Sequence, residues 1–321
     1  MELEEYERIT DAAVSAFLEE HFRSLEHAPP ILWQYTDLAG LQGILTNRRI
    51  WATHIRFLND PNEGLHTLDL LRERFEREDQ PAGVRFLSHA IEVTRAGTYL
   101  ACFSSDSDRL SQWRAYARDG EGFAIGMDLR AVPSHEDVGV PQNVCGGPFV
   151  VRVEYDARAK DRAFDALFDI GGMRMLPEPL RRDPKFQAIA AGAVLRMAHF
   201  CAVTFKHQAY EEEQEWRLVW LGPCVDKAPP GAKPTFAQQS YSKGHPDLPL
   251  RFRPTKYGLA PYLDWRLEPP SVAPSGNPPG PVIKQVVLGP KSTAETAFAI
   301  PAFLDCTGHD VEIRKSEASY R

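Results

Sequence analysis

The pattern of apolar and polar positions along the chain predicts six helices. In residues 3–22, Leu3, Tyr6, Ala13 and Phe17 recur at helical spacing among glutamates, which indicates an amphipathic helix. The other helices are expected at about 38–45, 61–78, 107–118, 184–210 and 293–306.

Strand-like segments are interspersed with these helices. In most of them apolar residues alternate with polar ones, and the rest are short apolar runs. Because strands and helices do not alternate strictly, the pattern favours an α+β fold over a doubly wound parallel sheet. The strands are expected at 31–35, 50–53, 98–104, 123–128, 149–155, 215–220, 282–288 and 311–315.

The chain is expected to form a single domain over residues 1–321, with an N-terminal helical extension at 1–28 and a core at 31–321. Proline and glycine dominate two stretches, near 223–249 and 269–281. Strand-like segments flank both stretches, so we expect surface loops or lids there and not domain linkers.

Composition narrows the classes of protein that fit. Hydrophobic residues make up 43% of the 321 residues, enough for a sizeable core, and the net charge of -7 argues against broad binding to nucleic-acid phosphates. Five cysteines without a CxxC or HExxH pattern predict reduced thiols and neither a zinc site nor a disulfide framework. An acidic start without a signal-like apolar segment, and the lack of any apolar run as long as a membrane span, predict a cytoplasmic protein.

The most unusual segment surrounds Glu215 and Arg217. In a strand that begins near Glu215, these two side chains share one face, while Trp216, Leu218 and Trp220 share the other and are expected to enter the core. Two interpretations stay open. The pair is a surface salt bridge at the start of a strand, or Glu215 is a catalytic carboxylate that Arg217 keeps ionised in a cleft.

A second candidate segment contains Gln34, Tyr35 and Thr36. These residues form the end of a strand, and Thr36 or Asp37 can cap the helix that follows. The functional alternative adds a ligand, because backbone N–H groups at a helix start bind anions and Tyr35 can contact a nucleotide.

Two further segments carry candidate residues. Asn59, Asp60 and Glu63 fit a turn with a helix cap, but their carboxylates are also suited to sugar hydroxyls or a cation. Near Ser104 and the following helix, Tyr116 is expected to point outward. The chain has no GxGxxG, P-loop or GxSxG pattern, which argues against a Rossmann site, a P-loop nucleotide site and an α/β-hydrolase triad.

Seven of these motifs, in this order, resemble a bacterial family known as domain of unknown function 2971. Each motif alone is weakly specific, but together they extend over nearly the whole chain. They are Tyr35-Thr36 ahead of Leu41 and Ile44-Leu45, Asn59 to Glu63, Cys102-Phe103-Ser104, Trp113 with Tyr116-Ala117 and Gly122, Glu213 with Glu215-Trp216-Arg217, Val286 to Pro290, and Tyr320-Arg321.

The layout of that family is similar to that of ADP-ribosyltransferases. The resemblance implies an ADP-ribosyltransferase-like split β-sheet core with flanking helices, NAD as the substrate and no metal. It implies catalytic roles for Glu215, Tyr35 and Tyr116, with Tyr35 at the place where well-known transferases carry Arg or His. The implied cofactor-binding residues are Gln34, Thr36, Asn59, Asp60, Glu63, Ser104, Trp113 and Arg217.

The expected function is therefore transfer of ADP-ribose from NAD to an acceptor, or hydrolysis of NAD, in a toxin, defence or other bacterial system. The acceptor stays open between a protein, a nucleic acid and a small molecule. Two alternatives remain: a non-enzymatic nucleotide-binding sensor module, and a metal-dependent nuclease that uses Asp60, Glu63 and Glu215.

Overall fold

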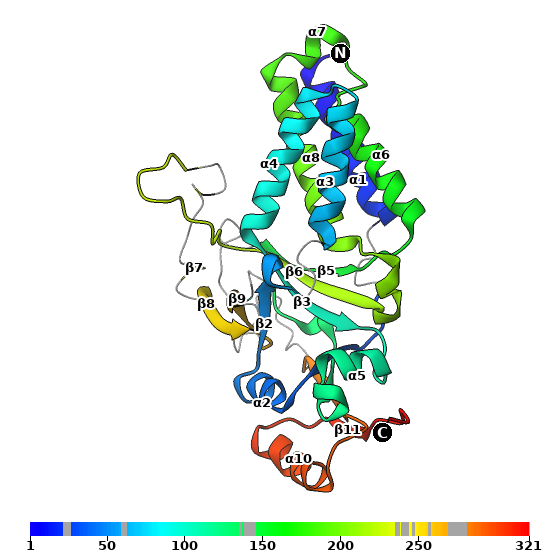
Figure 1. Ribbon diagram of the computed structural model, residues 1–321, viewed down its shortest axis with the longest axis vertical. Coiled ribbons are helices and arrows are strands. Elements are labelled where there is room, and N and C mark those ends of the chain that lie inside the picture. Colours follow the sequence, from blue (N-terminus) through cyan, green and yellow to red (C-terminus); the bar gives the residue numbers. More distant parts are fainter. Residues whose placement is uncertain are drawn as a thin grey trace.

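Strands from the whole length of the chain form one open, mostly antiparallel sheet in the computed structural model (Figure 1), which describes residues 1–21, 27–58, 63–134, 137, 146–234, 238, 244–245, 248–255, 258–268 and 281–320. The described strands are β1 (Leu32–Thr36), β2 (Arg49–His54), β3 (Thr98–Ser104), β4 (Phe123–Met127), β5 (Gly146–Arg152), β6 (Glu215–Leu221), β7 (Gly244–His245), β8 (Leu248–Thr255), β9 (Gly258–Arg266), β10 (Ile283–Leu288) and β11 (Glu312–Lys315). The expected α+β class is confirmed.

The sheet forks at β3. One edge of β3 pairs with β6 along its whole length, and β6 pairs in turn with β5. On the other edge, β2 pairs with β3 only near Leu100, and β1 pairs with β3 only at Ser104. From there β1 continues through β4, β10 and β11, while β2 continues through β9, β8 and β7. The middle of β3 therefore faces the space between two diverging arms.

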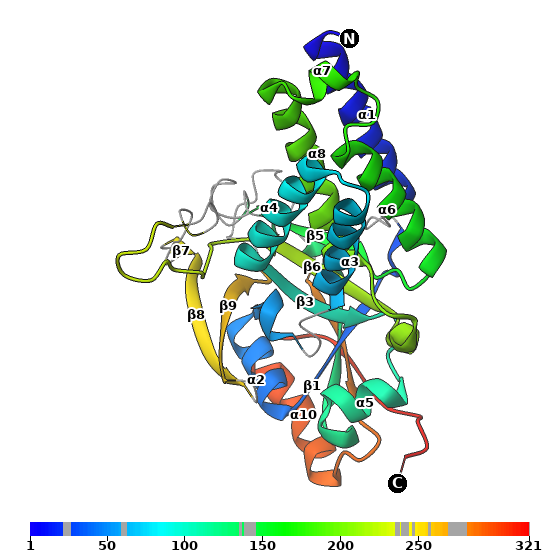
Figure 2. The ribbon, with the colours of Figure 1, turned by 45° about the horizontal axis from the view of Figure 1, so that its top comes forward.

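Helices cover the sheet in two groups, which Figures 1 and 2 show above and below the strands. The larger group surrounds the long α8 and packs on β3, β5 and β6 through an apolar cluster. The smaller group lies beside β1 and β4 at the other end of the molecule. The larger group contains α1 (Leu3–His21), α3 (Glu63–Arg77), α4 (Pro81–Gly97), α6 (Ala157–Gly171), α7 (Glu178–Arg181) and α8 (Pro184–Thr204), and the smaller group α2 (Leu38–Asn47), α5 (Leu110–Tyr116) and α10 (Ala294–Cys306).

Three helices of the larger group, α4, α6 and the four-residue α7, are missing from the sequence prediction. The two long ones, α4 and α6, are amphipathic. Phe86, Leu87 and Ile91 of α4 are buried, as is Leu167 of α6. The apolar residues of both helices therefore recur at helical spacing, which is the pattern that predicts a helix. Two predicted helices are also too long, since α8 ends at Thr204 and α5 is only seven residues.

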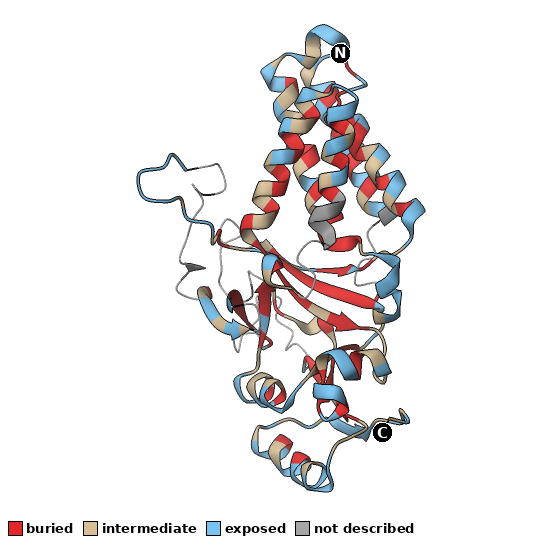
Figure 3. Cartoon of the chain, viewed as in Figure 1, coloured by how far each residue is buried: buried red, intermediate tan, exposed pale blue. Residues whose placement is uncertain are grey.

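The N-terminal α1 is part of this helical layer. Its Tyr6 and Phe17 are almost fully buried and contact Phe186 and Phe200 of α8, with ring centroids 5.3 and 5.8 Å apart. Figure 3 shows the buried residues along the strands and on the inward sides of the helices. The residues predicted as an N-terminal extension thus contribute to the core.

Helix α8 is long and apolar enough to cross a membrane, which corrects the expectation that no segment approaches that length. It is the central helix of its layer, and many of its residues, such as Val194 and Met197, are fully buried by protein. These features are those of a core helix in a soluble protein.

Candidate functional site

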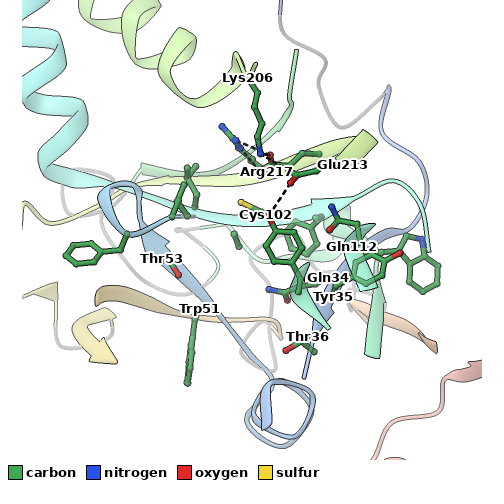
Figure 4. Close-up of a pocket in the computed structure, with 18 of the residues that line it drawn as sticks. Gln34, Tyr35, Thr36, Trp51, Thr53, Cys102, Gln112, Lys206, Glu213 and Arg217 are labelled. Atoms are coloured by element: carbon green, nitrogen blue, oxygen red, sulfur yellow. Dashed lines mark hydrogen bonds and ion pairs between the residues drawn. The ribbon is translucent and has the colours of Figure 1, made fainter. Parts of the chain in front are cut away.

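A cavity of about 380 Å³ opens where the arms of the sheet diverge (Figure 4). Its size lies within the range of ligand pockets. The described residues that line it come from β1, β2 and the segment just after it, the middle of β3, α5, the segment after α8, the turn before β6, β6 itself and β8. They are Trp33, Gln34, Tyr35, Thr36, Trp51, Thr53, Phe57, Leu58, Leu100, Ala101, Cys102, Phe103, Gln112, Tyr116, Lys206, Glu213, Glu215, Arg217 and Arg253.

Strand alternation directs Glu215 and Arg217 into this cavity. Trp216, Leu218 and Trp220 enter an apolar cluster on the opposite face of β6, as their period of two predicts. The pair is not a surface salt bridge, because the side chains of Glu215 and Arg217 are only 6% and 4% exposed. The interpretation that placed Glu215 in a cleft beside Arg217 agrees with the structure.

Glu215 is at the centre of a buried network of charges. Arg217 donates from Nε to Oε1 at 2.7 Å and from a terminal nitrogen to Oε2 at 3.0 Å. Lys206 Nζ donates to the same Oε2 at 3.0 Å and to Glu213 Oε2 at 2.7 Å. Arg217 also donates to the carbonyl of Val203, 2.8 Å away at the end of α8. Figure 4 shows Lys206, Glu213 and Arg217 together on one side of the pocket.

This network holds Glu215 in its ionised form. Burial alone would raise the pKa of Glu215, but the charges of Arg217 and Lys206 outweigh it and lower the pKa to about 2. The thiol of Cys102 lies beside the same carboxylate. Its removal from solvent and the Glu215 charge raise the pKa of Cys102 well above its usual value, so the thiol stays protonated.

Lys206 belongs to none of the motifs in the sequence, and Glu213 is known from the sequence only as part of the family motif. Lys206 is placed in the pocket because the chain leaves the helical conformation after Thr204, and its backbone N–H donates to Glu154. A lysine after an apolar helix gives no signal in sequence. Glu213 also accepts a hydrogen bond from the Tyr116 hydroxyl at 3.3 Å, which links α5 to the network.

Tyr35 lines the pocket, but its hydroxyl is engaged elsewhere. It donates to the Asp106 carbonyl at 2.9 Å and accepts from the Arg109 backbone N–H at 3.0 Å. Its ring packs edge-on against Trp113 at 4.8 Å, and burial raises its pKa above the usual value. These contacts fix the loop ahead of α5, so Tyr35 holds α5 and Tyr116 in place.

Gln34 and Thr36 also line the pocket, on the strand that carries Tyr35. The side-chain oxygen of Gln34 is buried and has no hydrogen-bond partner among the described residues. A buried amide oxygen without a donor is costly, and a ligand N–H or O–H would satisfy it. Of the two predicted caps of α2, Thr36 and Asp37, it is Asp37 whose side chain accepts from the Gly40 N–H, at 2.8 Å.

Other predicted site residues lie beside the pocket or outside the described residues. The Ser104 hydroxyl donates to the Glu213 carbonyl at 2.9 Å, and fully buried Trp113 donates from its indole nitrogen to Asp108 at 2.7 Å, so both hold the pocket wall without lining it. Asn59 and Asp60 lie outside the described residues. Glu63 is the first residue of α3, and its side chain is not described.

The opposite wall of the pocket comes from residues that the sequence analysis did not select. Thr53 of β2 accepts a hydrogen bond from Arg253 of β8 at 3.0 Å, and the Arg253 guanidinium lies 5.5 Å from the ring centre of Trp51. A period-two pattern marks Trp51 and Thr53 as neighbours on one strand face. It does not show that β8 arrives beside them, since that contact spans 200 residues of sequence.

Comparison with protein families gives one match. Residues 112–218 match the model of the family described as protein of unknown function (DUF2971), a segment that includes α5, Tyr116 and the Glu213 to Arg217 motif. The resemblance to this family is thus confirmed over that segment. Neither the curated proteins nor the solved structures contain a significant match to the chain. The ADP-ribosyltransferase-like core stays a prediction.

Proposed function

We propose that the pocket binds NAD or a closely related nucleotide and cleaves the glycosidic bond between nicotinamide and ribose. The C1′–N bond breaks with its electron pair going to nicotinamide, and C1′ forms a new bond to an oxygen or nitrogen atom of an acceptor, or to water, which releases its proton to solvent. One observation carries the proposal. An ionised, buried Glu215 shares a single cavity with Gln34 and Thr36 of β1 and with Tyr116 of α5, so two other parts of the fold contribute to it.

The chemistry requires a negative charge beside a cationic centre. Departure of nicotinamide leaves oxocarbenium character on the ribose, as in glycoside hydrolysis. A carboxylate whose pKa is about 2 remains charged at every physiological pH, so Glu215 is suited to stabilise that cation. Gln34 offers to the carboxamide or a hydroxyl of the ligand an oxygen that no described residue contacts by a hydrogen bond, and Tyr116 offers a ring at the pocket wall.

A second candidate function is nucleotide binding without turnover, as in a sensor module. The observation that favours it is the engagement of the Glu215 carboxylate. Both of its oxygens accept from Arg217, and one also accepts from Lys206. A carboxylate whose charge is balanced by two neighbouring cations stabilises a further cation less strongly. Turnover therefore requires that the ligand approach Glu215 closely, which a sensor does not need.

Release of nicotinamide during incubation with NAD distinguishes the two functions. We expect the wild-type protein to release it and Glu215→Gln to lose at least about 100-fold in rate, the size of loss seen when one electrostatic contact to a transition state is removed. Calorimetry should show that the variant still binds NAD. Glu121→Gln changes an exposed carboxylate paired with Arg118 and should behave as wild type.

The possible outcomes separate the candidates. Undiminished turnover by Glu215→Gln would contradict the enzymatic proposal. Saturable binding of NAD by the wild-type protein with no nicotinamide released would favour the sensor. Absence of both binding and release would remove NAD as the ligand.

The nuclease alternative has the least support. Asp60 lies outside the described residues, the Glu63 side chain is not described, and Glu215 is paired with Arg217 and Lys206. The described residues contain no group of three His, Cys, Asp or Glu side chains placed to hold a metal ion. Nuclease activity that EDTA abolishes would favour this function over the two above.

We further propose that the protein works in the cytoplasm. Its four described cysteines, Cys102, Cys201, Cys224 and Cys306, are free thiols, which suits a reducing compartment. The acceptor remains open among protein, nucleic acid and small molecule. Incubation with isotope-labelled NAD and separated cell fractions would identify which class becomes labelled.

A further inference from the structure

Arg253 differs from the other cations of the pocket because none of the carboxylates that the structure describes lies beside it. Lys206 and Arg217 are balanced by Glu213 and Glu215 within one network. Among the described residues, no acidic side chain lies within ion-pair distance of Arg253. The described pocket lining therefore carries three cations and two carboxylates, an excess of one positive charge in a chain of net charge -7.

The hydrogen bonds of Arg253 are also incomplete. One terminal nitrogen donates to Thr53 Oγ1 at 3.0 Å, but the buried Nε–H has no partner in the described structure. A guanidinium that is partly removed from water and unpaired is costly, and burial accordingly lowers the pKa of Arg253. Contact with the Trp51 ring at 5.5 Å and with Thr53 fixes its direction without neutralising it. Such a group is suited to take an anion from a ligand.

The same face of the sheet provides a comparison. Arg49, Arg251 and Arg253 all lie on the side of the β2–β9–β8 arm that carries Trp51 and Thr53, as the strand registers require. Arg49 and Arg251 both pair with Asp264, at 3.5 and 3.2 Å. Only Arg253 of these three also lines the cavity.

The position of Arg253 indicates how long the ligand must be. Thr53, its hydrogen-bond partner, is paired with Leu100, whereas Glu215 is paired with Ser104. These positions are four residues apart along β3, or about 13 Å at the rise of a strand. A ligand that contacts both groups therefore has its anionic group well separated from the bond that Glu215 faces.

We propose that Arg253 is the anion-binding residue of the pocket and takes the pyrophosphate of a dinucleotide whose nicotinamide riboside end lies at Glu215. This inference rests on the proposed function for the identity of the ligand. The inference makes Arg253 a residue that determines specificity for the ligand. It lies on β8, a strand that contains none of the motifs found in the sequence. Phosphate oxygens accept from the fork of N–H donors that the guanidinium presents, including the Nε–H that has no partner among the described residues.

Calorimetric titration with two probes tests the assignment. NAD carries the pyrophosphate, and nicotinamide riboside lacks any phosphate. We expect Arg253→Ala to weaken NAD binding by roughly tenfold to a hundredfold, the value of a charge-assisted hydrogen bond, and to leave the affinity for nicotinamide riboside unchanged. Arg253→Lys should recover part of the loss, because it restores the charge and not the fork. Arg251→Ala, the matched control, should bind both probes as wild type does.

Two results would overturn the inference: equal losses for both probes in Arg253→Ala, or no loss for NAD. Circular dichroism would confirm that the variants are folded.

Titration with ADP and with inorganic pyrophosphate separates this inference from the proposed function. Binding of ADP that depends on Arg253, in a protein that releases no nicotinamide, supports the anion site and contradicts the enzyme. If the Arg253→Ala variant turns over NAD with the same affinity and rate as the wild-type protein, the result supports the enzyme and contradicts the anion site. No binding of any of these probes contradicts both.

Discussion

Two carboxylates of this protein each lie between two cations and are themselves largely buried, with side chains 6% exposed for Glu215 and 11% for Asp264, but their cations differ in exposure. Glu215 is held by Arg217 and Lys206 at 2.7 to 3.0 Å, and all three side chains are at most 7% exposed. Asp264 lies 3.5 Å from Arg49 and 3.2 Å from Arg251, whose side chains are 26% and 51% exposed.

The difference shows where the fold has fixed charge in place. Water can solvate Arg251 if it leaves Asp264, so that contact adds little to stability. Water reaches Arg217, Lys206 and Glu215 poorly. Each of the two cations therefore depends on the carboxylate for its stability, and the carboxylate depends on both cations. The Glu215 network therefore has one arrangement, which is the property that a site for chemistry requires.

The largest expected difference concerns stability. Glu215→Ala leaves two buried cations without their shared partner, so we expect a loss of about 3–5 kcal/mol in the free energy of unfolding. Asp264→Ala releases two part-exposed arginines to water and should cost only about 1 kcal/mol. Urea denaturation of both variants measures these values. Equal losses would mean that burial does not distinguish the two sites.

Acid should weaken the Glu215 network over a defined range of pH. The folded-state pKa of Glu215, about 2, is below its ordinary value of 4.5, so its ionisation stabilises the protein fully above about pH 4.5. That stabilisation, on the order of 3 kcal/mol, is lost as the pH falls from 4.5 through 2. Glu215→Gln should show a smaller loss of stability than wild type across this range. Parallel acid curves for the two proteins would contradict the assigned pKa.

Removal of one cation from each site sharpens the comparison further. Lys206→Met keeps the length of the side chain but leaves Glu213 and Glu215 with one donor fewer, for an expected cost of about 1–3 kcal/mol. Arg251→Met should change stability by less than about 0.5 kcal/mol. Thermal unfolding of the two variants provides the measurement, and a larger shift for Arg251→Met would reverse the ranking.

The smallest expected effect is the response to salt. Double-mutant cycles should give a coupling energy below about 1 kcal/mol for Arg251 with Asp264, and 1 M NaCl should remove most of it. The coupling of Lys206 with Glu215 should hardly change, because the pair is shielded from solvent ions. A salt-sensitive Lys206–Glu215 coupling would show that the pocket admits water more freely than the exposures of its side chains indicate.

The parts of the fold that the sequence predicted are those in which apolar residues recur at a regular spacing. The strand near Ser104, and the face of β6 that Trp216 shares with Trp220, follow from alternation, and the strand near Tyr35 follows from a short apolar run. The helices α4 and α6 carry the same kind of signal and were missed. The β8–β9 hairpin begins at the end of the stretch near 223–249 that is dominated by proline and glycine. Its two strands were therefore not predicted.

The candidate site was predictable in part for the same reason. Glu215 and Arg217 were selected because a charged pair on an apolar strand is unusual, and both line the pocket. Tyr35 was selected as a catalytic residue, but its hydroxyl is used by the backbone of the loop before α5. The hydrogen-bond partners of a tyrosine depend on which loop folds over it, and local sequence does not specify that.

The sequence by itself determined which side of β6 faces solvent or ligand, because the alternation of a strand is a local property of its backbone. Only the tertiary structure decided that Lys206 reaches the Glu215 carboxylate, that β1 and β2 diverge over the middle of β3, and that Arg253 closes the far wall. These contacts join residues that are distant in sequence or follow a break in a helix. They form only when the sheet and its helical layer pack together, since each is stabilised by the burial that the others create.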